Sequence, residues 1–288
     1  MSSDEAKLNK HCLHQLKNKH GFSLIELVVV IVILGVLATG ISTFINFGTQ
    51  VYTDATDREK VVSSARFAIE RLNRELRIAM PNSIRINTNN LTGVSAKQCI
   101  EFTPIIFSTT YTEIAVAPEA ASDEIKVIAF DEALFDAGFS PNLKVGVYIL
   151  NDSDFYDGSS DNIFTLLNNT IDKSGQEWTL KLNSVEVFAE NSPTERLYFF
   201  NQSVSYCVEN SRLTRHQNYN RNADNTPTDL GVLMAENLTM HNGNTLIPPF
   251  WLTEATQLRN SMVLIKLAFT SNLESIVFNN EIQVSNVP

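Results

Sequence analysis

The chain has 288 residues and a formal net charge of −10, enough for one sizeable domain with extensions. It has no Lys/Arg-rich tract, and this acidic balance argues against nucleic-acid binding, because neutralising phosphates supplies most of that affinity. Neither a Walker-type Gly loop nor a nucleophile-elbow string occurs. The histidines beyond residue 21, His216 and His241, are expected at the surface, so the sequence indicates a protein that is not an enzyme.

A basic start is followed by a long apolar run. Before residue 22, four lysines stand against two acids: Lys7, Lys10, Lys17 and Lys19 against Asp4 and Glu5. From residue 24 to residue 45 the only ionisable side chain is that of Glu26, and about 20 apolar residues suffice for a helix to cross a hydrocarbon core. Residues 22–45 are therefore expected to span a membrane once, with the basic leader in the cytoplasm and the C-terminal bulk outside it. A cleaved secretion signal, the competing interpretation, needs a shorter apolar region of about 7–15 residues.

Glu26 is the unusual residue in this run. An unpaired charge in lipid costs at least about 2.5 kcal/mol, so an intramembrane acid is by default a functional candidate. A positive group at the same depth would be its natural partner. The α-amino group of Phe22 would be such a group if the chain were cut after Gly21.

Gly21, Phe22 and Glu26, in this setting, resemble the signature of type IV pilins and type II secretion pseudopilins. Members of this prepilin family have a short basic leader ending in Gly, then Phe, an apolar helix, and Glu at the fifth mature position. The resemblance implies that prepilin peptidase removes residues 1–21 and N-methylates Phe22. It also implies that Glu26 pairs with a neighbouring subunit's N-terminus during assembly. An ordinary signal anchor that happens to carry Glu26 is the alternative.

Residues 22–80 are expected to form one long helix. No Pro interrupts them, and Pro81 ends the pattern. Residues 46–80 show an apolar stripe at spacings of three and four, which predicts that this second half packs on a domain. The stripe consists of Val62, Ala65, Ile69, Leu72, Leu76 and Ala79. Many major pilins carry a Pro about twenty residues into this helix, and its absence here favours a minor, pseudopilin-like subunit.

Residues 81–288 are expected to form a large, mainly antiparallel β domain folded over the second half of the helix. Short apolar runs alternate there with turn residues. The expected strands are 99–102, 112–117, 124–130, 144–150, 178–182, 185–189, 196–200, 204–209, 262–270 and 282–284. Residues 210–229 are expected to form an exposed loop. The fold class is therefore α+β and pilin-like.

The cysteines predict a disulfide. Cys12 lies in the leader, which leaves Cys99 and Cys207 in the exported part. Two thiols in an oxidising compartment normally form a bridge, although only geometry decides. Two buried free thiols are the alternative.

One segment resembles a metal site. Residues 151–162 contain Asp152, Asp154, Asp157 and Asp161 around a Gly, and calcium takes six to eight oxygens from flexible loops outside the cytosol. The spacing does not fit the EF-hand register, and a solvated acidic loop without a metal is the alternative. No other cofactor is expected.

Further strings resemble the PilW and pseudopilin J group of large minor pilins. Residues 70–77 resemble the end of its long helix and residues 204–215 its tyrosine-containing hairpin. Together with residues 99–104 and 284–288, they are most similar to a minor pilin-like component of MSHA pilus biogenesis. The resemblance implies a structural subunit of the inner membrane whose C-terminal domain lies in the periplasm. Its partners would be other minor and major pilins and the inner-membrane assembly platform, and it would act at pilus initiation or at the tip. A type II secretion minor pseudopilin J-like subunit, a pilus-tip adhesin and a membrane-anchored periplasmic enzyme are the alternatives.

Overall fold

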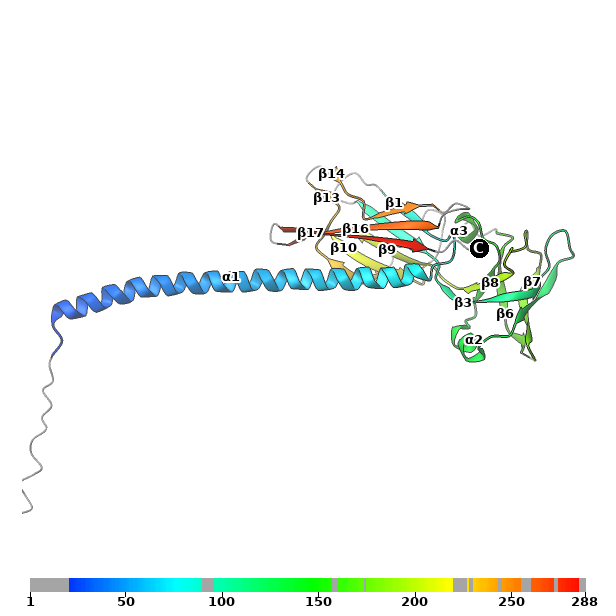
Figure 1. The fold of residues 1–288 in the computed structure, drawn as a ribbon, viewed down its shortest axis with the longest axis horizontal. Helices are drawn as coiled ribbons and strands as arrows, with labels where there is room; N and C mark the ends of the chain where they lie inside the picture. The colour runs from blue at the N-terminus through cyan, green and yellow to red at the C-terminus, as the bar shows by residue number, and fades with distance from the viewer. Residues whose placement is uncertain are drawn as a thin grey trace, which may run out of the picture. The chain divides into compact units, whose positions relative to one another are not determined.

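The chain was analysed as a computed structural model, shown in Figure 1. It describes residues 21–89, 96–156, 160–173, 175–219, 227, 230–242, 245–254, 260–271 and 274–284. The chain divides into two compact units, residues 1–55 and residues 56–288, and each is described by itself.

Helix α1 (Leu24–Arg77) contributes to both units. In the first unit every described side chain is exposed. By length and composition, α1 is the one helix of the described residues that could cross a membrane, and its most apolar window has a mean hydropathy of 2.8. In the second unit one face of α1 is buried. That face consists of Val61, Ala65, Ala68, Ile69, Leu72 and Leu76.

The expected apolar stripe needs a small correction. Val61 is buried while Val62 is only half-buried, and Ala79 lies beyond the end of the helix. The helix ends at Arg77, where the amide of Ile78 donates to the Glu75 carbonyl in a tighter turn that leads to Pro81.

Two antiparallel sheets share a core with this buried face. The first has the order β1-β2-β9-β10-β11, with β1 (Arg85–Asn89), β2 (Lys97–Phe102), β9 (Val204–Glu209), β10 (Arg212–Gln217) and β11 (Val232–Glu236). The second is built around β16 (Ser261–Ser271), which pairs with β12 (Leu238–Thr239), β15 (Phe250–Thr253) and β17 (Glu274–Val284). A small hairpin joins β13 (His241–Asn242) to β14 (Thr245–Leu246).

A closed antiparallel barrel is inserted between β2 and β9. Its strand order is β3-β4-β7-β6-β5-β8. The strands are β3 (Ile105–Glu113), β4 (Ser122–Ile128), β5 (Lys144–Gly146), β6 (Ile163–Asp172), β7 (Glu177–Glu186) and β8 (Arg196–Phe200). Two short helices accompany them, α2 (Glu132–Gly138) and α3 (Ser153–Tyr156).

The barrel has an aromatic-rich core of its own, which includes Phe135, Trp178 and Phe199 and no residue of α1. The expectation that the whole β region folds over the helix is therefore wrong for this part, because a closed barrel turns its apolar side chains toward its own axis. A third cluster, which includes Met80, Ile149 and Phe200, connects the barrel to the segment that follows α1.

The predicted strands are confirmed unevenly. Residues 196–200 and 204–209 have the expected bounds, whereas the strand expected at 112–117 begins at Ile105 and ends at Glu113. Residues 210–229 are not simply a loop, since β10 occupies part of them. The alternation of β10 was hidden because its buried positions include Arg215 and His216, both polar.

Candidate functional site

The first turn of α1 is capped by Ser23. Its Oγ accepts a hydrogen bond from the backbone amide of Glu26 at 3.3 Å, and its carbonyl accepts one from the amide of Leu27 at 3.2 Å. Ser at the cap with Glu three residues later is the spacing of a capping box, which is a sequence signal for the start of a helix at this point. Gly21 and Phe22 lie just before this cap, with Phe22 82% exposed.

Glu26 lies in the first helical turn, where a negative charge is favourable beside the unpaired amides of the helix terminus. The cap uses only its backbone, and its side chain is exposed. Among the described residues, the Glu26 carboxylate has no ion pair. The arrangement therefore presents one carboxylate beside the predicted cleavage point, available to a positive group from outside the chain.

The surface behind Glu26 is continuously apolar. Every large hydrophobic side chain of α1 from Leu24 to Tyr52 is exposed. Water-soluble monomers rarely expose apolar patches of more than a few hundred Å². An exposed apolar surface of this extent is typical of a contact with a membrane or with another protein.

An ion-pair cluster fixes the other end of α1 to the first sheet. Arg215 of β10 donates from Nε to both carboxylate oxygens of Glu75, at 3.1 and 2.9 Å, and Arg71 donates to the same carboxylate at 3.0 Å. Burial, with the Glu75 carboxylate nearby, raises the pKa of the Tyr206 phenol. This cluster was missed because Arg215 lies in the segment expected to be a loop.

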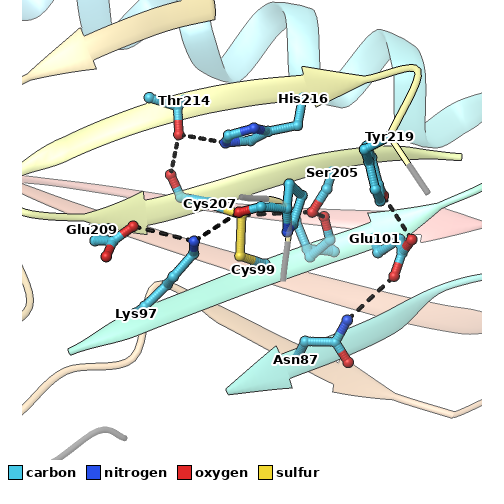
Figure 2. The surroundings of a disulfide bond; sticks show 12 residues. Asn87, Lys97, Cys99, Glu101, Ser205, Cys207, Glu209, Thr214, His216 and Tyr219 are labelled. Atoms are coloured by element: carbon cyan, nitrogen blue, oxygen red, sulfur yellow. Dashed lines mark hydrogen bonds and ion pairs between the residues drawn. A yellow bond between two sulfur atoms is a disulfide. The ribbon is translucent and has the colours of Figure 1, made fainter. Parts of the chain in front are cut away.

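The structure joins Cys99 to Cys207 in a disulfide. The two residues face each other on the neighbouring strands β2 and β9 (Figure 2). Lys97 and Glu209 form an ion pair at 3.2 Å between the same two strands. The cysteines are 108 residues apart in sequence, and the whole barrel lies between them, so the bond ties the sheet together at the root of the insertion.

A buried carboxylate lies in the same sheet. Glu101 accepts hydrogen bonds from Arg85 Nε at 2.7 Å, Asn87 Nδ2 at 3.2 Å and the Tyr219 hydroxyl at 2.6 Å; Figure 2 shows the last two. Burial, followed by the nearby Glu101 charge, raises the pKa of Tyr219. The guanidinium of Arg85 also lies 3.6 Å from the centre of the Tyr156 ring. These contacts are structural, because each charged group is paired within the protein.

The expectation for His216 is wrong. Only 5% of this residue is exposed, its Nε2 lies 2.9 Å from Thr214 Oγ1, and a Cβ on Gly231 would lie 2.6 Å from its ring. His241 is exposed as expected.

The acidic segment 151–162 is described only in part, and Asp157 lies outside the described residues. The short helix α3 lies in the first half of the segment, and the Asp154 carboxylate accepts a hydrogen bond from the Asn151 amide at 3.4 Å. Asp152 and Asp161 are exposed. In the parts of the chain that the structure describes, no group of three or more His, Cys, Asp or Glu side chains could hold a metal ion. Calcium binding stays a prediction.

Comparison with known proteins points to the N-terminal segment. Residues 16–42 match the family described as the prokaryotic N-terminal methylation motif, and this range contains Gly21, Phe22 and Glu26. No curated protein and no solved structure matches the chain. A long apolar N-terminal helix followed by a large antiparallel β domain is an α+β, pilin-like fold. The motif and the helix together support a membrane-anchored structural subunit of the type IV prepilin family, which includes pilins and pseudopilins.

Proposed function

We propose that this chain is a minor pilin-like subunit of an MSHA-type type IV pilus, similar to the biogenesis protein MshO. Prepilin peptidase cleaves after Gly21 and methylates the new N-terminus at Phe22. The single carboxylate of Glu26, at the start of an otherwise apolar and exposed helix segment, is the observation that carries the proposal.

In this proposal the first half of α1 spans the inner membrane before assembly, and the β domain lies in the periplasm. The basic leader favours this orientation. The Cys99–Cys207 disulfide is compatible with it, because such bonds persist in oxidising compartments. The subunit then joins other minor and major pilins at the inner-membrane assembly platform.

The bulk of the β domain favours a position at the pilus tip or in the initiation complex. The inserted barrel adds a second core to the two sheets around α1. A subunit with such a head would crowd a regular helical lattice, so it fits best where few copies are needed. This step rests on size and on analogy.

Two other assignments use the same N-terminal chemistry. A minor pseudopilin J-like subunit would place the chain in a type II secretion system, and the genes beside its own would separate that assignment from a pilus. A pilus-tip adhesin would additionally need a ligand site on the β domain.

Replacing Glu26 by Val tests the proposal. The Ser23 hydroxyl accepts a hydrogen bond from the backbone amide of residue 26. The substitution keeps this amide, so the helix should still begin at the same residue. We expect the variant to insert into the inner membrane at least as well as the natural chain, because it removes an unpaired charge from lipid, yet to be absent from sheared filaments. Glu26→Gln is the matched control, because it keeps the shape of the side chain and removes only its charge. We expect this variant to be absent from sheared filaments as well. Equal incorporation of Glu26→Val and the natural chain would refute the role of Glu26.

A further inference from the structure

A cleft of about 620 Å³ opens in the β domain, where β1 and β15 meet the segment before α3. This volume is within the range of about 300–1,000 Å³ that small-molecule sites occupy. The described wall residues come from five separate parts of the chain, within residues 82–86, 150–152 and 250–254 and at Gln98 and Ser261, so the fold of the domain creates the cleft.

Trp251 of β15 is in the wall of this cleft and is 37% exposed. Every other described aromatic side chain beyond α1 is buried or half-buried. Its neighbour Phe250 points into the core and is 1% exposed. The buried side chain of Gln98 binds both backbone groups of Phe250, accepting from its amide at 3.0 Å and donating to its carbonyl at 3.2 Å. These hydrogen bonds fix the strand next to Trp251, whose indole stays partly exposed although its burial would be favourable.

The polar groups around Trp251 decide which ligand fits. Asn82, Asn151, Asp152 and Glu254 line the cleft, and amides both donate and accept hydrogen bonds while carboxylates accept them. Among the described lining residues the one cation is Arg85, and its guanidinium pairs with the buried Glu101 at 2.7 Å. The described lining residues would therefore offer an anionic ligand two carboxylates and no cation other than Arg85, which is already paired with Glu101.

We propose that this cleft binds a neutral carbohydrate. A sugar ring presents a flat face of C–H groups that can lie on the indole of Trp251. Its hydroxyl groups both donate and accept hydrogen bonds, so they can pair with the amides and carboxylates that line the cleft. The inference goes beyond the proposed function and does not depend on it, since the site lies entirely in the β domain.

The test uses the full chain in a detergent without a sugar head group, because a glycoside detergent would occupy the site. An array of neutral glycans identifies ligands, and each one is then titrated in solution while tryptophan emission is followed. The sequence contains two tryptophans, and the other, Trp178, is 4% exposed in the barrel core. A Trp178→Phe variant therefore makes the emission report on Trp251 alone.

We expect at least one neutral oligosaccharide to change the emission of Trp251. The affinities of the variants are measured by isothermal titration calorimetry, because Trp251→Ala removes the reporting indole. The affinity should fall at least tenfold in Trp251→Ala and severalfold in Asn151→Ala, an exposed residue whose loss should not disturb folding. Val185→Ala, which truncates another exposed apolar side chain, is the matched control and should bind as the natural chain does. No binding to any neutral glycan, or binding that Trp251→Ala leaves unchanged, would overturn the proposal. A change in Trp251 emission with a polylysine peptide but with no glycan would assign the cleft to a cationic partner instead.

Discussion

Removing the Cys99–Cys207 disulfide should lower the free energy of unfolding substantially. The cysteines are 108 residues apart, and the chain-entropy relation for a loop of that length gives about 4.8 kcal/mol as the upper bound. Both residues are fully buried, so replacing both by Ala also removes a little packing. We expect a measured loss of roughly 2–5 kcal/mol, the usual range for a native disulfide.

The size of this loss depends on whether the barrel unfolds with the sheets. If the barrel stayed folded, the pairing of β3 with β8 would hold the two ends of the insertion together, and the disulfide would close only a short loop. The cluster of Met80, Ile149 and Phe200 connects the barrel to the rest of the domain. We therefore expect the two parts to unfold together.

Urea unfolding of single-tryptophan chains measures both quantities. Trp178 reports on the barrel and Trp251 on the second sheet, so Trp251→Phe and Trp178→Phe chains are compared with and without the disulfide. We expect each pair of transitions to coincide and to shift to lower urea when the cysteines are replaced. A loss below about 1 kcal/mol, or separate midpoints for the two tryptophans, would refute the reasoning.

Two further predictions concern buried charges and phenols. Glu75→Gln leaves the Arg215 side chain, 10% exposed, without its counter-ion, and should cost roughly 3–5 kcal/mol in urea unfolding. Arg215→Met should cost less, because Glu75 keeps Arg71; the reverse order would contradict the assigned geometry. The pKa values of Tyr156, Tyr206 and Tyr219 are raised above 10.0, chiefly by burial. Above about pH 10 the unfolded chain therefore binds fewer protons than the folded one, and the free energy of unfolding should fall as pH rises. Stability unchanged between pH 9 and pH 11 would argue against their burial.

Much of the fold was predictable because its signals are local. The absence of Pro before Pro81 and the long apolar run predict α1, and alternating apolar residues predict β8 and β9. The N-terminal site is local for the same reason, since its motif lies within a few residues of the helix start.

The barrel and the cleft could not be predicted in this way. The barrel is closed by pairings such as β3 with β8, whose strands are far apart in sequence, and no linker composition marks the insertion. Arg215 and His216 were expected at the surface because the residues that they contact are distant in sequence: Glu75 of α1 for the arginine, and Gly231, directly before β11, for the histidine. Nothing in the sequence separates Trp251 from the buried aromatic residues, and only its exposure on β15 sets it apart.

Mass spectrometry of the N-terminus tests the central claim most directly. The protein is purified from its native membrane, and its N-terminal peptide is sequenced and weighed. The account predicts a chain that begins at N-methylated Phe22. A retained leader, or a cut beyond the apolar run that ends near residue 45, would contradict processing as a prepilin and would leave the position of Glu26 unexplained.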